Sequence, residues 1–472
     1  MKLKIYTLFF LMMYLAGCKI PANINVDKNI RSIPQSYNET NDTSKVDLVN
    51  WKTFFTDPLL QKLIDTALLH NNDLKIAYQN IEIARSGLQF TKGAMLPQVS
   101  VGSSAAIRRY GLYTMDGAGN ISTEILPDKI VPVNLPDFYL GLQSNWEVDF
   151  RGKLKNQHQS SYARYLQSME GIKYVKSNLI ADIVIAYFEL LSLDNELDMI
   201  KATKVKQTEA LEFIIAQKEA GKGNELAVQQ FTAEQINLDI LENEITQQML
   251  LQENKINFLL GRFPQTIARN QKTLFDKLPD LFAGVPSQLL QNRPDIKMAE
   301  LNLLAAKFDL NAARAAFYPS FTINSGLGFQ AFNTKYLFRT PESIAYTLLG
   351  NVVAPIVNRS AIMSNFNFAK ANQLEVLYKY QQNILNAYVE VLNNLNEIQY
   401  VEKIKKLTFD KNVQYQQSIQ TSLDLYKSAR ASYLDVLLSQ QNALQSNIDL
   451  INATKRSMIL KVKLYKSLGG GW

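Results

Sequence analysis

Residues that could perform a reaction are few and scattered in this chain of 472 residues. The two histidines, His70 and His158, are far apart in the sequence, and neither lies in a recognisable catalytic setting. Arg293-Pro294-Asp295 brings opposite charges together, but a proline in the first helical turn with an acid beside it is the usual start of a helix. The sequence shows no catalytic triad, phosphate loop or metal-ligand cluster. We therefore expect a protein that is not an enzyme and that binds no cofactor or metal ion.

The lone cysteine, Cys18, is the exception, because its surroundings predict a covalent modification. A basic start and an apolar run over residues 5–16 are too short for a permanent membrane helix. Leu15-Ala16-Gly17-Cys18 resembles the lipobox of bacterial lipoproteins, where the chain is cut before a lipidated cysteine; the alternative is an ordinary signal peptide. We expect a signal peptide over 1–17 and a lipid-anchored extended segment over 18–50. Lys19, instead of aspartate, favours the outer membrane by resemblance to enterobacterial sorting rules.

The overall charge and hydropathy exclude several classes of protein. The formal net charge of +7 is a mild excess without a dense basic block, so nucleic-acid binding is not expected. A mean hydropathy of −0.13 excludes a bundle of transmembrane helices. Any part of the chain that spans a membrane must therefore have a weaker sequence signal than the long apolar run of a transmembrane helix.

The chain repeats its own pattern. Residues 74–97 match 296–319 at an offset of 222, as in the pairs Leu74/Ile296 and Pro97/Pro319, and later matches such as Gly261/Gly469 follow an offset of 208. This period is too long for a solenoid, so we predict two structural repeats, 51–270 and 271–472, related by pseudo-symmetry.

Proline placement indicates where long helices are possible. All fourteen prolines lie outside residues 137–263 and 356–472, and proline disrupts a helix interior. A helix over 153–219 would be about 100 Å long, which exceeds a single globular domain. Heptad-like spacing in the last helix is also compatible with an ordinary soluble coiled coil. The helices expected are 153–219, 225–260, 294–316, 360–427 and 433–467.

Segments with alternating polarity interrupt these helices. Leu140, Leu142 and Val148 alternate with Gly141, Gln143 and Glu147, which is typical of a transmembrane β-strand with lipid on one face and water on the other. We predict strands over about 98–112, 137–150, 319–332 and 343–357, joined in pairs by long polar connections that would be extracellular. Candidate aromatics at the membrane interfaces, each of which could equally be a packed core residue, are Tyr110, Tyr139, Trp146, Phe332 and Tyr336.

Four strands cannot close a barrel, and open edges are not tolerated in hydrocarbon. Three chains would supply twelve strands, enough for a barrel with a water-filled lumen. The expected fold is therefore a mixed α and β membrane protein, a trimeric twelve-stranded β-barrel continuous with a long α-helical barrel.

Four segments resemble one known family, the outer membrane efflux proteins. They are 51–59 (WKTFFTDPL), 146–153 (WEVDFRGK), 284–296 (GVPSQLLQNRPDI) and 313–320 (ARAAFYPS). Within this family, the segments resemble the lipoprotein branch similar to TolC and OprM, of the NodT type. This resemblance implies a homotrimer whose helical tunnel lies in the periplasm. It also implies a periplasmic adaptor (a membrane fusion protein) and an inner-membrane pump, such as one of the resistance-nodulation-division type, which drives small toxic compounds through a passive outer-membrane duct.

The turns of the two long helical hairpins are where the resemblance implies docking to the adaptor. Small residues in these turns would allow partner helices to approach closely. Ala429 stands where the family commonly has glycine, and the charge of the nearby constriction stays open between acidic, basic and mixed. The docking candidates are Gly221, Lys222, Gly223, Asn224, Ala429, Arg430, Ala431 and Ser432, and the pore-gate candidates are Asp424, Lys427 and Arg430.

The sequence is also compatible with other functions. Within the same class, the duct could export metal ions or proteins by type I secretion. From a different class, a lipid-anchored coiled-coil scaffold would explain the helices and Cys18 but would give the alternating strands no role.

Overall fold

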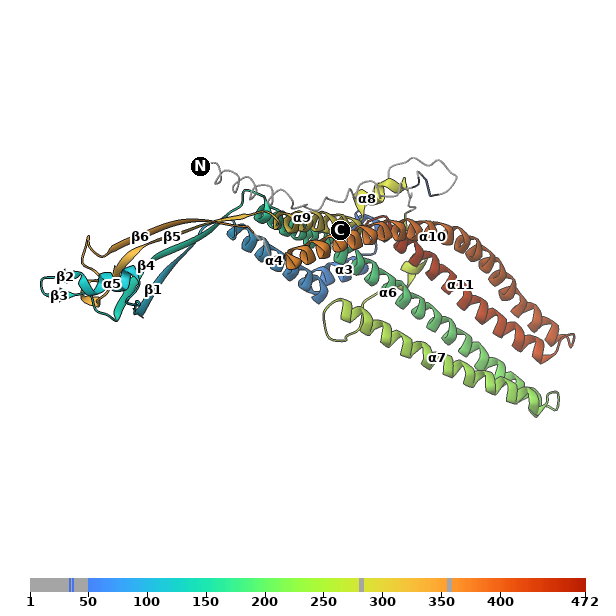
Figure 1. Cartoon of the computed structure of the whole chain (residues 1–472). Helices are drawn as coiled ribbons and strands as arrows, with labels where there is room; N and C mark the ends of the chain where they lie inside the picture. The colour runs from blue at the N-terminus through green and yellow to red at the C-terminus, as the bar shows by residue number, and fades with distance from the viewer. Residues whose placement is uncertain (1–33, 35, 38–49, 280–283, 355–358) are drawn as a thin grey trace. The chain divides into compact units, whose positions relative to one another are not determined.

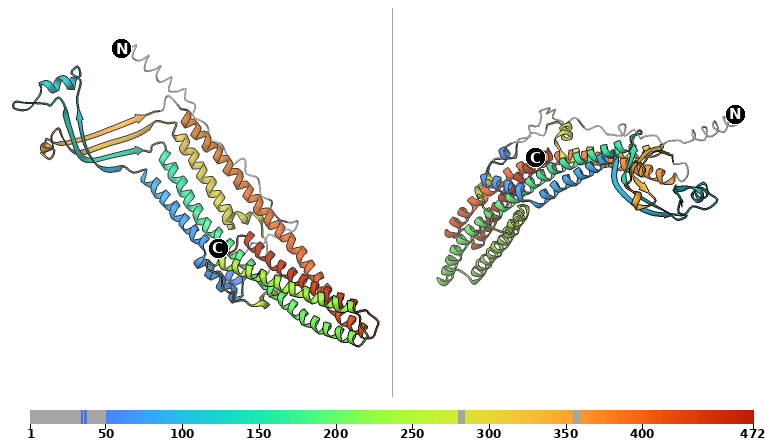
Figure 2. Two further views of the ribbon diagram at one scale, coloured as in Figure 1. Left: turned by 90° about the horizontal axis from the view of Figure 1, so that it is seen from below. Right: turned by 90° about the vertical axis from the view of Figure 1, so that its left-hand side faces the viewer.

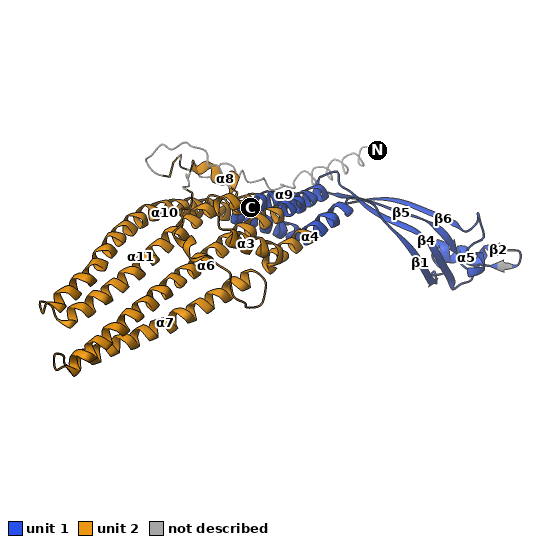
Figure 3. Cartoon of the chain, turned by 180° about the vertical axis from the view of Figure 1, so that it is seen from behind, with its two compact units in different colours: residues 1–28, 83–166, 301–377 blue, residues 29–82, 167–300, 378–472 orange. Residues whose placement is uncertain are grey.

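The computed structural model describes residues 34, 36–37, 50–279, 284–354 and 359–472 (Figure 1). The predicted signal peptide and Cys18 lie outside the described residues. The chain divides into two units (Figure 3). The strand unit contains the described residues of 83–166 and 301–377, and the helical unit contains those of 29–82, 167–300 and 378–472.

The strand unit is built on one four-stranded antiparallel sheet in the order β1-β4-β5-β6 (Figure 2). Its strands are β1 (Gln98–Arg108), β4 (Leu135–Val148), β5 (Ser320–Ala331) and β6 (Ile344–Val353). Adjacent strands pair in continuous register, so that rows of aligned residues cross the sheet. Among the described residues, β1 and β6 each pair on one side only, and both outer strands are largely exposed.

The strand ends differ from the expected ones because pairing sets them. β1 ends at Arg108, which pairs with Leu135 at the start of β4, so residues 109–112 have no strand opposite them. β4 begins two residues earlier than predicted and ends at Val148, because the Asp149 carboxylate accepts a hydrogen bond from the backbone N–H of Lys155 (2.6 Å) in the following helix. β6 ends at Val353, and part of its predicted extension, 355–358, lies outside the described residues.

The connection from β1 to β4 is more structured than the loop that the sequence predicts. It contains α5 (Met115–Ser122) and a small antiparallel pair, β2 (Glu124–Leu126) and β3 (Lys129–Ile130). The Thr114 hydroxyl accepts a hydrogen bond from the backbone N–H of Gly117 (3.1 Å), which caps α5 and explains why a helix begins there. The connection from β5 to β6 contains η4 (Thr334–Tyr336).

Long helices make up most of the remaining chain. α6 (Lys153–Glu219) and α7 (Glu225–Leu259) form one antiparallel hairpin, and α10 (Ser360–Lys427) and α11 (Tyr433–Ser467) form another (Figure 1). Corresponding helices have similar lengths, 67 and 68 residues for α6 and α10 and 35 for α7 and α11. The other helical segments are α2 (Trp51–Phe54), α3 (Pro58–His70), α4 (Asn72–Gly93), η2 (Gln271–Phe275), η3 (Pro286–Gln288), α8 (Leu289–Asn292) and α9 (Pro294–Ala315).

The largest core lies in the helical unit, where α2 and α3 pack on the middle of α6 and on α11. Phe54 stacks on Tyr465 with ring centroids 4.5 Å apart, and both side chains are buried. The Asp57 carboxylate caps α3 by accepting the backbone N–H of Leu59 at 2.8 Å, with Pro58 in the first turn. No helix in the described part of the chain is long and apolar enough to cross a membrane.

Candidate docking tips and pore face

The first hairpin turn closes through backbone hydrogen bonds that need a left-handed residue. Gly221 has φ +70°, and its N–H donates to the carbonyl of Lys218 at 3.0 Å. The N–H of Lys222 reaches back to the carbonyl of Gln217 at 2.9 Å, which completes a Schellman-type helix end. Asn224 then caps α7, because its side-chain oxygen accepts the N–H of Ala227 at 2.9 Å. The small residues of this turn therefore have a structural role of their own.

The second turn repeats this geometry with alanine in the left-handed position. Ala429 has φ +56°, and the N–H of Arg430 donates to the carbonyl of Leu425 at 2.8 Å. Ser432 and Asp435 form a capping box at the start of α11. The backbone N–H and hydroxyl of Ser432 donate to Asp435 and hold the pKa of that carboxyl below its usual range. Alanine at position 429, where the family commonly has glycine, thus carries a conformational cost, because its Cβ atom crowds the backbone in the left-handed conformation.

A direct contact joins the two hairpins next to their turns. The Tyr426 hydroxyl of α10 donates to the Gln217 side-chain oxygen of α6 at 2.6 Å, and the Tyr426 ring packs edge-on against Phe213. A cavity of about 220 Å³ lies beside this bond and is lined by residues of both turns, including Lys222 and Ser432. Sequence reasoning missed the Tyr426–Gln217 bond, because nothing in the sequence shows which faces of α6 and α10 meet.

The predicted gate residues are near one another along the chain and exposed. Asp424 lies one turn before Lys427, the last residue of α10, and Arg430 lies in the turn that follows. The Gln420 amide donates to the Asp424 carboxylate at 3.0 Å. A gate formed by these three charges stays a prediction about the assembly.

The sheet has two chemically different faces, which the register makes continuous. The row Val101–Leu142–Leu327–Tyr346 crosses all four strands on one face, and each of these apolar side chains is exposed. The adjacent row, Ser100–Gln143–Gly326–Thr347, is one residue away along each strand and therefore lies on the opposite face, which carries small polar and amide side chains. An exposed apolar face on a sheet with two open edges is unfavourable for an isolated chain in water.

Comparison of the sequence with known protein families identifies the family of this chain. The sequence model of the outer membrane efflux proteins matches residues 63–262 and 285–470. The chain belongs to this family. It is therefore an efflux protein of the outer membrane, and the resemblance that the four sequence segments carry is confirmed.

Several relatives match nearly the whole chain. The cation efflux system protein CusC of Escherichia coli O6:H1 is 27% identical over 475 residues, covering 98% of each chain. The solvent efflux pump outer membrane protein SrpC of Pseudomonas putida is 28% identical, covering 89% of this chain and 87% of SrpC. The probable outer membrane lipoprotein SilC of Salmonella typhimurium is 27% identical, covering 96% of this chain and 93% of SilC. A crystal structure of CusC superposes with a TM-score of 0.80 at 26% identity, covering 93% of this chain and 97% of that chain.

The five candidate interface aromatics of this efflux protein occupy different settings. Trp146 lies near the helical end of β4, and its indole N–H donates to the Met95 carbonyl at 3.1 Å. Phe332 and Tyr336 contact each other at the opposite end of the sheet, with ring centroids 5.5 Å apart, and Tyr110 follows β1 at that end. Tyr139 lies on the polar face, where its hydroxyl donates to the Leu142 carbonyl at 3.2 Å. Residues of one parity along a strand share a face, so Tyr139 lies on the same face as Gln143 and Glu147, and its role at a membrane interface stays a prediction.

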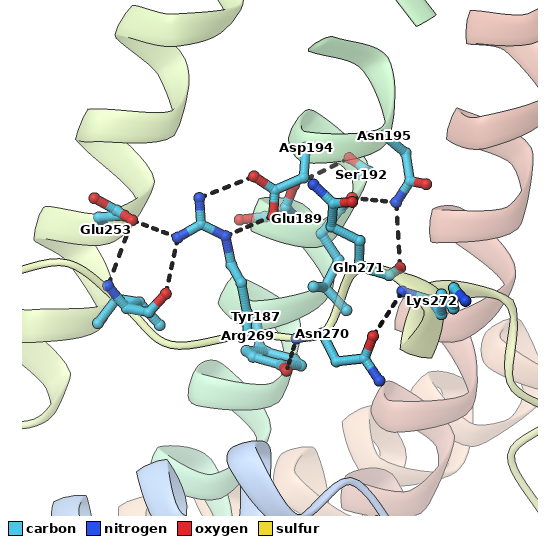
Figure 4. A network of polar contacts seen from close by, with 12 residues as sticks. Tyr187, Glu189, Ser192, Asp194, Asn195, Glu253, Arg269, Asn270, Gln271 and Lys272 are labelled. Atoms are coloured by element: carbon cyan, nitrogen blue, oxygen red, sulfur yellow. Dashed lines mark hydrogen bonds and ion pairs between the residues drawn. The ribbon is translucent and has the colours of Figure 1, made fainter. Parts of the chain in front are cut away.

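Sequence reasoning also missed a buried charge cluster in the helical unit (Figure 4). The strap, residues 262–279, follows α7 and carries Arg269, whose guanidinium donates to both oxygens of Asp194 on α6 at 2.5 and 2.8 Å. The same guanidinium forms an ion pair with Glu253 on α7. Burial opposes the charge of Arg269, but the hydrogen bonds to Asp194 and Glu253 outweigh it and raise its pKa. Arg269 therefore fastens the strap to both helices of the hairpin.

Arg293 has a similar role in the second half of the helical unit. α9 begins at Pro294, as the sequence predicts, but the neighbouring Arg293 does more than precede a helix. Its guanidinium pairs with Asp295 at 2.8 Å and with Glu390 of α10 at 2.7 Å, and it also donates to the Ser467 carbonyl at the end of α11 (2.9 Å). Burial lowers the pKa of Arg293, and these two carboxylates raise it by more. Arg293 thus links α9, α10 and α11.

Proposed function

We propose that three copies of this chain assemble into a passive exit duct. Each copy would contribute its four-stranded sheet to a twelve-stranded barrel in the outer membrane, continuous with a tunnel of long helices in the periplasm. The observation that carries this proposal is the sheet itself, which has an exposed apolar face, a polar face and two open edges. Pairing β1 of one copy with β6 of the next would satisfy both edges and leave only the apolar face toward lipid.

The two helical turns are the proposed docking surface for a periplasmic adaptor. Both turns are exposed, and both line the cavity beside Tyr426 and Gln217. An adaptor hairpin that entered this cavity would separate Tyr426 from Gln217 and loosen the contact between the two hairpins. Asp424, Lys427 and Arg430, repeated in three copies, would then form the charged rim of the opening.

The remaining parts of the proposal concern the anchor, the pump and the cargo. Cys18 would carry the lipid anchor, as the likeness to the lipoprotein SilC supports. An inner-membrane pump of the resistance-nodulation-division type would supply the energy for transport through this passive duct. Small toxic compounds or drugs are the proposed cargo. Metal ions are the second candidate, because the relative that covers 98% of this chain is named as a cation efflux protein.

Reconstitution tests the duct directly. Purified full-length protein from outer-membrane fractions should migrate as a heat-modifiable trimer and should give discrete single-channel currents in planar lipid bilayers. A soluble, non-conducting rod would contradict the duct and would favour the coiled-coil scaffold.

A second experiment tests the docking turns. Lys222→Trp adds bulk at an exposed turn position without requiring a left-handed backbone, so it should block export in cells while trimers and conductance persist. Gly221→Trp and Ala429→Trp should do the same, with additional strain in the turn. Gly87→Trp on the exposed surface of α4 is the matched control, because a Cβ atom added at Gly87 meets nothing within 4 Å. Normal export by all three turn variants would exclude these turns as the docking surface.

A further inference from the structure

A groove between α10 and α11 in the helical unit holds a cavity of about 500 Å³. This volume is within the range of small-molecule binding sites. The lining residues of α10 are spaced i, i+3, i+4 and i+7, which places them on one face of the helix. They are Glu402, Lys405, Lys406 and Phe409, and the other lining residues are Leu450 and Thr454 of α11 and Phe275 of η2. We call this cavity the basic groove.

Two aromatic side chains border the basic groove from different segments of the chain. Phe409 of α10 is 54% exposed, and Phe275, at the end of η2, is 56% exposed. The preceding residue of η2, Leu274, is fully buried, so η2 is held in the core while Phe275 stays in contact with solvent. An apolar group that entered the groove would remove surface of both aromatic rings from water, which is favourable.

The side chains of the basic groove give it a positive charge. Lys405 and Lys406 contribute two ammonium groups, and Glu402 contributes one carboxylate. That carboxylate accepts a hydrogen bond from the buried Ser457 hydroxyl, so one of its oxygen atoms is already engaged. Among the ion pairs of the described residues, none involves Lys405 or Lys406. Both ammonium groups therefore keep their donors for a bound anion.

The first hairpin shows what covers the corresponding position there. Asp194 of α6 precedes Glu402 by 208 residues, the offset that relates the two halves, and it binds Arg269 of the strap at 2.5 and 2.8 Å. At the same offset, the acidic Asp198 corresponds to the basic Lys406. The first hairpin thus binds a cationic side chain of its own chain, whereas the second hairpin has the opposite charge at this level. A ligand of the second hairpin should therefore be an anion.

We propose that the basic groove binds an amphipathic organic anion. Its carboxylate or sulfonate would accept hydrogen bonds from Lys405 and Lys406, and its apolar body would lie between Phe275 and Phe409. Because Phe275 belongs to the strap and the other lining residues belong to α10 and α11, the bound anion would also hold the strap against this hairpin. All of these residues belong to one chain, so the site does not depend on the proposed duct.

Isothermal titration calorimetry of purified full-length protein in lipid nanodiscs tests the site, with 2-naphthalenesulfonate as the probe and empty nanodiscs as the baseline. Wild-type protein should bind this anion more tightly than 2-naphthylmethylammonium, a cation with the same ring. Lys405→Met and Lys406→Met keep the apolar stem and remove one charge each. Each should weaken binding by about fivefold, the effect of one unit charge at contact distance in water. Phe409→Ala should also weaken binding, because it removes one of the two aromatic walls.

Lys403→Met is the matched control, since Lys403 is a lysine of α10 outside the groove, with its ammonium 5.6 Å from the centre of the Tyr400 ring. Its affinity should equal that of the wild type. Bound 2-naphthalenesulfonate should also slow hydrogen exchange in residues 271–279 of the wild type, but not of the double variant Lys405→Met, Lys406→Met. Equal binding of anion and cation, no binding by wild-type protein, or unchanged affinity in the double variant would each overturn the proposal. None of these results requires channel conductance, so failure of the site and failure of the duct are distinguishable.

Discussion

Replacing Arg269 with methionine should release the strap from the helical unit. The substitution keeps most of the side-chain volume but removes the cation between Asp194 and Glu253, whose side chains are only 5% and 14% exposed. Breaking a buried pair by removing one partner leaves uncompensated charge and typically costs about 3–5 kcal/mol. Since each 1.4 kcal/mol changes an equilibrium constant tenfold, local opening of the strap should become roughly 10²- to 10⁴-fold more frequent.

Hydrogen exchange of purified trimers, followed by mass spectrometry on peptides from residues 262–279, measures this opening. The triple variant with Arg269→Met, Asp194→Asn and Glu253→Gln should recover much of the lost protection, because no charge is then left unpaired. Lys272→Met is the control, since Lys272 is an exposed residue of the same strap. Exchange in Arg269→Met that stays within about threefold of the wild type would refute the view that this ion cluster fastens the strap.

Three further perturbations test other parts of the fold. Gly141→Ala should prevent trimer formation, because its Cβ atom would lie 2.5 Å from neighbouring backbone, whereas Gly87→Ala on open helix surface should assemble normally on semi-native gels. Ala429→Gly should relieve the left-handed strain and stabilise the second hairpin by up to about 1 kcal/mol, so that hydrogen exchange at its turn slows; faster exchange would contradict this. Because Ser432 lowers the pKa of Asp435, the cap is intact above the ordinary aspartate pKa and is lost as pH falls through the lowered value. Proteolysis of the turn should therefore increase in strong acid, and Asp435→Asn should abolish that pH dependence.

Local chemistry explains which parts of the fold the sequence predicts. The ends of α6 at Glu219 and of α10 at Lys427 are set by neighbouring residues. A residue in left-handed conformation follows each end within two positions, and Asn224 or Ser432 then caps the next helix. The alternation in β4 likewise shows its two faces, because neighbouring residues in a strand point to opposite sides.

Long-range contacts explain what the sequence misses. β1 ends where β4 begins, at the pairing of Arg108 with Leu135, and no residue near Arg108 signals that end. Arg269 meets Asp194 across 75 positions, so its role depends on how the helices pack. The interpretation of Arg293 as part of a helix start was incomplete for the same reason, since Glu390 is 97 positions away.

The two open edges of the sheet have a genetic consequence. In the proposed trimer, each sheet edge pairs with the sheet of another copy. A mutation that disrupts β1 in one chain therefore also leaves β6 of the neighbouring chain unpaired. If altered and normal chains are made equally and mix at random, only about one in eight trimers would contain normal chains alone. Edge mutations should therefore be dominant over a normal gene copy, whereas mutations that stop a chain from folding at all should be recessive.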